Sequence, residues 1–194
     1  MTKQKTDWYS LPPLQKQILL HLALKGAKTR NEVAQELGSA YKNVLFSFNS
    51  LKKKGLIKQV GEKKHRQRKF PYYWLSEVGI ILAFMEGASK DVLFEKTKEF
   101  YPNNETLNSF IEFASVFTPD VQKIAFASIK SKGKLEIIDL FNILFIQMEV
   151  EPDFNKFREA LNLLKKYPKA CETFKQNLEI WNKVMSLVSE VLGP

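Results

Sequence analysis

Five cations within a stretch of seven residues could bind phosphate groups. They are Lys63, Lys64, Arg66, Arg68 and Lys69. Lysine and arginine make charge-assisted hydrogen bonds to phosphate oxygens, and arginine side chains also enter the narrow minor groove of duplex DNA. A single acid, Glu62, lies beside them. The segment therefore suits a polyanionic partner much better than a buried core.

A second group of side chains, between residues 30 and 47, could contact the edges of bases. The amide of Asn43 can make paired hydrogen bonds to adenine, and Lys42 can donate to guanine or to a phosphate. The ring of Phe46 can touch a thymine methyl group, and it could equally anchor a protein partner. With the basic segment, the predicted DNA-binding residues are Arg30, Ser39, Tyr41, Lys42, Asn43, Phe46, Ser47, Lys63, Lys64, Arg66, Arg68 and Lys69.

Two helices joined by a tight turn are predicted to position this second group. Thr29 predicts the cap of a short helix over residues 30–37, and Gly38 predicts a turn after it. Ser39 is then expected to cap a longer helix, at about residues 40–54. These elements form a helix-turn-helix.

Helical periodicity separates a buried face from an outward face on the longer helix. At about 100° per residue, Phe48 and Leu51 fall within about 40° of Val44. We expect these three residues to pack into the core. The polar and aromatic residues near the start of the helix are then free to meet base edges.

Two candidate strands follow the second helix. Residues 56–60 and 70–75 are rich in β-branched and aromatic residues, and the basic segment 61–69 is expected to be the loop between them. An amphipathic helix over about residues 11–25 precedes the helix-turn-helix. Three helices and a β-hairpin in this order are the parts of a winged helix-turn-helix domain, which we assign to residues 1–80.

The residues that pack these helices and end the hairpin form a recurring pattern. They are Ser39, Asn43, Val44, Phe48, Leu51, Gly55, Leu56, Ile57 and the run from Tyr73 to Gly79. In them the chain resembles the winged-helix domains of MarR-like, ArsR-like and PadR-like prokaryotic transcription regulators, over about residues 11–80. The resemblance implies sequence-selective binding to duplex DNA. It places the second helix of the motif in the major groove and the wing on the neighbouring backbone or minor groove.

Charge is divided unevenly along the chain. Residues 1–80 hold 16 Lys and Arg against 5 Asp and Glu, whereas residues 81–194 hold 14 against 16. The whole positive excess therefore lies in the first part, where it gathers on a helix end and the basic segment. This clustering favours nucleic acid as the partner, and a solvated basic face or an acidic protein surface is the alternative.

The chemistry-bearing residue types argue against an enzyme or a metalloprotein. The chain has one cysteine, Cys171, and two isolated histidines, His21 and His65, so no metal-ligand spacing appears. No nucleophile with its base, glycine-rich phosphate loop or other cofactor motif is present either. No apolar run suggests a membrane span or a signal peptide. We expect a soluble cytoplasmic protein that needs no cofactor or metal.

Residues 81–194 are predicted to form an all-helical domain, so the whole chain is expected to be mainly α. Ser89, Asn104 and Thr118 each precede a helical pattern, and none of the segments alternates as a strand. Phenylalanines at helical spacing could line a pocket for an apolar effector, but such residues more often form plain core. No polar cluster indicates what an effector would be.

The last helix carries an apolar seam. Its members are spaced 4, 3, 4, 3 and 4 residues apart: Phe174, Leu178, Trp181, Met185, Val188 and Leu192. This spacing suits a helix that pairs with its twin, and it equally suits a helix that packs into its own domain. Two-fold pairing would extend the short site that one winged helix covers, so a homodimer is expected.

These observations predict a dimeric transcription regulator that binds double-stranded DNA through the helix 40–54 and the wing 61–69. The alternative is a winged-helix module that binds proteins within a larger assembly, a role for which an exposed Phe46 would be suited. The two differ in one property, because a regulator prefers a particular duplex sequence and a pure scaffold binds no DNA.

Overall fold

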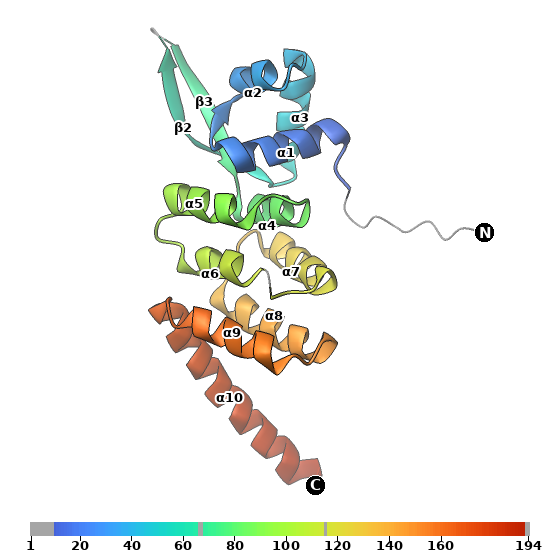
Figure 1. Cartoon of the computed structure of the whole chain (residues 1–194), viewed down its shortest axis with the longest axis vertical. Coiled ribbons are helices and arrows are strands. Elements are labelled where there is room, and N and C mark those ends of the chain that lie inside the picture. The colour runs from blue at the N-terminus through green and yellow to red at the C-terminus, as the bar shows by residue number, and fades with distance from the viewer. Residues whose placement is uncertain (1–9, 66–67, 115, 193–194) are drawn as a thin grey trace, which may run out of the picture. The chain divides into compact units, whose positions relative to one another are not determined.

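The computed structural model describes residues 10–65, 68–114 and 116–192 (Figure 1). These residues are mainly helical and contain one small antiparallel sheet near the N-terminus. They divide into two compact units, Met1–Ala88 and Ser89–Pro194. The first unit thus extends past residue 80 and includes a helix beyond the hairpin.

The described residues of the first unit form four helices and three strands. In chain order they are α1 (Pro13–Lys25), β1 (Lys28–Thr29), α2 (Arg30–Glu36), α3 (Tyr41–Lys53), β2 (Ile57–His65), β3 (Arg68–Leu75) and α4 (Glu77–Met85). The hairpin of β2 and β3 extends beyond the three helices α1, α2 and α3 (Figure 1). The predicted order of three helices followed by a hairpin is confirmed.

The sheet is larger than the predicted two-stranded ribbon. Its strand order is β1-β3-β2, because Lys28 pairs with Tyr73 and Thr29 with Tyr72. The predicted loop 61–69 is also wrong for the most part: pairing of β2 with β3 continues outward to His65 and Arg68. Lysine and glycine are poor strand formers, so the composition of residues 61–69 does not indicate the strand pairing that the hairpin register imposes.

Residues of α1 and the sheet form the centre of this unit's core. Ile18, Leu19 and Leu22 on α1 are buried, as is Trp74 on β3. The indole Nε1–H of Trp74 donates to the backbone carbonyl of Leu22 at 2.9 Å, so the one polar atom of this large side chain is satisfied inside the core.

The chain passes very close to itself where α4 begins. The Ser76 hydroxyl caps α4 by accepting from the Gly79 N–H at 3.0 Å, and the Ser76 N–H donates to the carbonyl of Leu56 at 3.0 Å. A Cβ on Gly79 would lie 1.9 Å from that carbonyl oxygen. Only glycine fits at this contact between α4 and the residue before β2.

In the second unit, the residues that the structure describes form six helices. They are α5 (Lys90–Phe100), α6 (Glu105–Phe113), α7 (Pro119–Lys132), α8 (Ile137–Val150), α9 (Phe154–Leu164) and α10 (Pro168–Leu192). The predicted caps are confirmed at Asn104 and Thr118, whose side chains accept from the N–H groups of Leu107 and Val121. Ser89 also occupies the cap position of α5, although its hydroxyl makes no capping hydrogen bond.

The last helix of this unit is 25 residues long and only partly packed. Its first turns contact α6, α8 and α9, and its C-terminal part extends away from them (Figure 1). Within the described residues, no helix combines the length and the apolar character needed to cross a lipid bilayer.

Candidate nucleic-acid interface

The start of α3 is set by a glycine turn rather than by a serine cap. Gly38 has a φ of +60°, which glycine adopts without strain, and the Ser39 N–H then donates to the carbonyl of Ala34 at 3.0 Å. The cap residue of α3 is Ala40, and no side chain caps the helix. The predicted capping role of Ser39 is therefore wrong, and its half-buried side chain lies one residue before the cap.

The buried face of α3 is the predicted one. Val44, Phe48 and Leu51 are fully enclosed, and the ring of Phe48 meets that of Tyr73 edge-on with centroids 5.6 Å apart. Ser47 belongs to this face, with 8% of its surface exposed, so its hydroxyl is not available at the outer surface. It lies about 60° from Val44 on the wheel, within the arc of more than about 100° that a core-facing helix commonly buries.

The remaining candidates on α3 are exposed together at its N-terminal end. Tyr41, Lys42, Asn43 and Phe46 all present their side chains to solvent. Phe46 is 60% exposed, and the ammonium of Lys42 lies over its ring, 6.0 Å from the centroid. A hydroxyl, an amide and an ammonium on one helix end can donate to and accept from base edges.

Arg30, at the start of α2, is directed toward β3. Its guanidinium lies over the ring of Tyr73, 5.1 Å from the centroid, and donates to the Tyr73 hydroxyl at 3.0 Å. The Nε–H of Arg30 is buried and meets no acceptor among the described residues. Arg30 is thus half-buried beside the outward surface of α3, with one donor unsatisfied.

The cations of the hairpin lie on both faces of the paired strands. Lys63 is opposite Phe70 and Lys64 is opposite Lys69, and successive side chains of a strand point to opposite faces. Lys63, Arg68 and Phe70 therefore share one face, and Lys64 and Lys69 share the other. All five side chains are exposed. Arg66 falls outside the described residues.

Two of these cations have acidic partners. Lys63 donates to Glu32 on α2, and Lys69 lies 3.5 Å from Glu62. No carboxylate in the described part of the chain lies within ion-pair reach of Lys64 or Arg68. The two cations best able to meet phosphates without first leaving a carboxylate are consequently Lys64 and Arg68.

Glu32 links the hairpin to α2. Its carboxylate also accepts from the backbone N–H and the hydroxyl of Thr29, at 2.8 and 2.9 Å. Burial by itself would raise the pKa of Glu32, but the hydrogen bonds from Lys63 and Thr29 outweigh it and lower the pKa to about 2. The same contact raises the pKa of Lys63 above its usual value. Both groups stay charged at neutral pH.

A hollow joins the start of α3 to the hairpin. It has a volume of about 200 Å³ and is lined by Thr29, Arg30, Asn31, Tyr41, Phe70 and Pro71. A neighbouring hollow of about 290 Å³ lies between Asn31, Glu32, Lys63 and Phe70. Tyr41 of α3 and Phe70 of β3 therefore belong to one continuous surface. Sequence reasoning missed Asn31, Glu32 and Phe70, since they lie near the other candidates only after folding.

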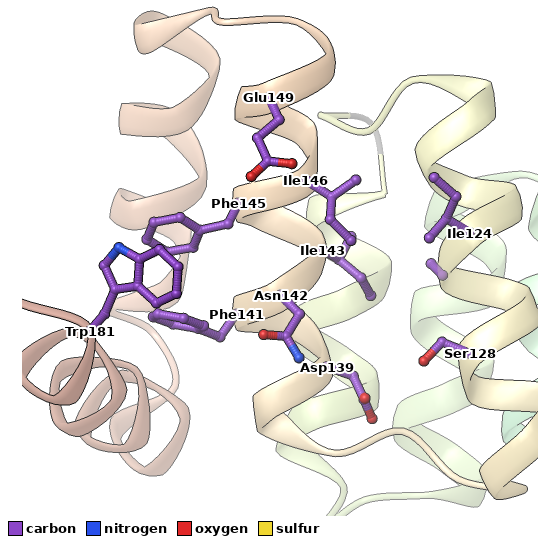
Figure 2. A pocket seen from close by; sticks show the side chains of 11 residues that line it. Ile124, Ser128, Asp139, Phe141, Asn142, Ile143, Phe145, Ile146, Glu149 and Trp181 are labelled. Atoms are coloured by element: carbon purple, nitrogen blue, oxygen red, sulfur yellow. The ribbon is translucent and has the colours of Figure 1, made fainter. Parts of the chain in front are cut away.

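The second unit contains a mainly apolar pocket of about 420 Å³ between α7, α8 and α10. Figure 2 shows the rings of Phe141 and Phe145 on α8 beside that of Trp181 on α10. The Phe145 and Trp181 centroids are 6.0 Å apart. Asp139, which also lines the pocket, already accepts from Lys132 at 2.5 Å and from the N–H of Glu136 at 2.9 Å. The lining indicates no particular effector.

The predicted seam of α10 is buried at its first residue and exposed farther along the helix. Phe174 is buried, with its ring centroid 5.0 Å from that of Phe141. The next four seam residues, Leu178, Trp181, Met185 and Val188, are exposed by 37–46%. The side chain of Leu192 is outside the described part. The start of the seam therefore packs into its own unit, and Trp181 also contacts Phe145, while Leu178, Met185 and Val188 are open along α10.

Comparison of the chain with protein-family models, with curated proteins and with solved structures found no match.

Proposed function

We propose that this protein is a cytoplasmic, DNA-binding transcription regulator of the winged-helix kind, without enzymatic activity. In this proposal α3 enters the major groove, where Lys42 and Asn43 contact base edges. The hairpin of β2 and β3 acts as the wing and places Lys64 and Arg68 on the neighbouring backbone or in the minor groove.

The observation that supports this proposal most is the hollow shared by Tyr41 and Phe70. Because of it, the exposed end of α3 and the cationic hairpin belong to one surface and can meet one ligand together. Each phosphate neutralised by a cation releases counterions, which supplies affinity. The polar side chains on the helix end supply the chemistry for base recognition.

The proposal is tested by selecting bound duplexes from a random pool with the full-length protein, followed by gel shift with unrelated competitor DNA. A regulator yields an enriched sequence and keeps its complex in the presence of competitor. Enrichment of no sequence, with a complex lost to competitor, would reduce the function to non-specific DNA binding. A protein that shifts no duplex at all would instead favour the alternative role as a protein-binding module, for which the exposed Phe46 is the supporting observation.

The regulator is further proposed to act as a homodimer through α10. Beside the open part of the seam lies a second exposed apolar line, formed by Ile180, Val184, Leu187 and Val191. The two lines together cover about half the circumference of the helix at about 100° per residue. An apolar stripe of this width, with the charged residues on the opposite side, suits another helix of the same sequence. When the two stripes meet, the charged side chains face away from the interface, so no like charges repel each other across it.

Sedimentation equilibrium at micromolar concentration tests the dimer. Val184→Glu and Leu187→Glu place charges within the apolar stripe and are expected to give monomers. Ser186→Glu, on the exposed polar side of the same helix, is the matched control and should stay dimeric. A wild-type protein that sediments as a monomer would exclude α10 as a strong dimer seam.

A further inference from the structure

Two exposed aromatic rings border the hollow between α3 and β3. Tyr41 is 50% exposed and Phe70 is 40% exposed, and both line the same 200 Å³ space. Pro71 adds a further apolar surface to the lining. Rings left open to solvent at a concave site can stack on a flat aromatic ligand, and every nucleobase offers such a face.

A base inside a duplex cannot stack fully on the rings of Tyr41 and Phe70. Inside a duplex the two faces of each base are covered by its stacked neighbours, and only the edges are open in the grooves. A base that has left the stack, at a single-stranded end or an extruded position, exposes its faces. The rings of Tyr41 and Phe70 are therefore suited to an unpaired base rather than to a groove.

Polar groups in the lining can hold the edge of such a base. Asn31 is exposed and carries an amide with both donors and an acceptor. Arg30 also lines the hollow, and its buried Nε–H has no acceptor among the described residues. The other guanidinium N–H groups of Arg30 can donate to a carbonyl or ring nitrogen of a base.

The charges next to the hollow suit a nucleic-acid strand. Lys63 and Arg68 occupy the same face of the hairpin as Phe70. The carboxylate that contacts this face, that of Glu32, is held as the partner of Lys63. A phosphate on either side of an inserted base could therefore meet Arg68 without opposing an unpaired carboxylate.

We propose that the hollow between Tyr41 and Phe70 binds an unpaired nucleobase, so that the protein prefers DNA with a single-stranded end or an extruded base over a fully paired duplex. This inference rests on the proposed DNA-binding function and adds a substrate preference to it. Base stacking, rather than phosphate contact alone, provides the difference in affinity.

The test compares three DNAs of the same duplex sequence at one salt concentration. The first is blunt, the second has a short single-stranded end carrying 2-aminopurine, and the third has the same end with abasic sugars. Phosphates are equal in the second and third. Full-length protein should bind the base-containing end about 5- to 140-fold more tightly than the abasic end, the range expected for one stacked base. The 2-aminopurine fluorescence should fall on binding because the base stacks.

Tyr41→Leu and Phe70→Leu, made separately, remove one ring each and keep an apolar side chain. Each should reduce the preference for the base over the abasic end, with an unchanged unfolding midpoint. Phe154→Leu is the matched control: Phe154 is 73% exposed on α9 in the second unit, and its replacement should leave the preference intact.

The outcomes separate this inference from the proposed function. Equal affinity for the blunt, base-containing and abasic DNAs would overturn the inference while the DNA-binding function stands. An abasic end that binds as tightly as the base-containing end would assign the gain to phosphates and also overturn it. Failure to bind any of the three DNAs would overturn the proposed function and this inference together.

Discussion

The salt dependence of DNA binding gives the sharpest test of the wing. Replacing both Lys64 and Arg68 by alanine should flatten the plot of log affinity against log salt concentration. On B-DNA each phosphate contact contributes a slope of about −0.9. Neither cation has a carboxylate partner in the described part of the chain, so both contacts should be lost in full. The expected change in slope is about 1.8 units.

This slope corresponds to a readily measured difference in affinity. Raising salt from 50 to 200 mM weakens binding about 3.5-fold for each phosphate contact, and hence about 12-fold for two. Wild-type affinity should therefore fall about 12-fold more than that of the double variant over this range. Fluorescence anisotropy with a labelled duplex measures both curves. Lys63→Ala should change the slope by less than one unit, since Lys63 must leave Glu32 before it can meet a phosphate.

A matched variant distinguishes local contact from net charge. Arg158 and Lys175 are exposed cations of the second unit, so alanine at both removes the same charge from a different place. The slope of this control should equal that of the wild type. If the Lys64 and Arg68 variant kept the wild-type slope, the wing would be excluded from the interface. If the control variant flattened the slope as strongly, the effect would come from the net charge of the whole protein and not from local contacts of the wing.

Two further predictions concern the first unit. Glu32→Gln should strengthen DNA binding and steepen its salt dependence by up to about one unit, as Lys63 becomes free to meet a phosphate. The same variant should be about 1 kcal/mol less stable than wild type at neutral pH, after allowance for the exposed Lys63. Because the pKa of Glu32 is lowered to about 2, the stability difference between wild type and variant is present above pH 4.5 and disappears as pH falls toward 2. Urea unfolding at several pH values would measure it. Gly79→Ala should cost about 1–3 kcal/mol in the same assay, since its Cβ would meet the Leu56 carbonyl oxygen.

Local patterns along the sequence predicted the helices and their buried faces. Val44, Phe48 and Leu51 recur with helical spacing, and the cap side chains of Asn104 and Thr118 accept from N–H groups three residues along the chain. These features depend on near neighbours in the chain. A single residue type can mislead at this range: Ser39 suggests a helix cap, but the cap residue of α3 is Ala40, one position later.

Pairing between distant segments could not be predicted in the same way. The two residues of β1 carry no periodicity, and they are a strand only because β3 lies beside them. The Glu32 and Lys63 contact joins residues 31 positions apart, so no spacing rule indicates it. The hollow depends on Arg30, Tyr41 and Phe70, which three separate elements bring together.

In the proposed interface, affinity and selectivity would come from different residues, so the two properties can be measured separately. Lys64 and Arg68 would act on phosphates, and their contribution falls as salt rises. Tyr41 and Phe70 would act by stacking, and Asn43 by hydrogen bonding to a base edge, neither of which releases condensed counterions. Raising the salt should therefore remove the contribution of the wing and leave that of the rings and the amide. The ratio of affinities between a preferred DNA and other DNAs should then stay the same while the absolute affinity for each falls.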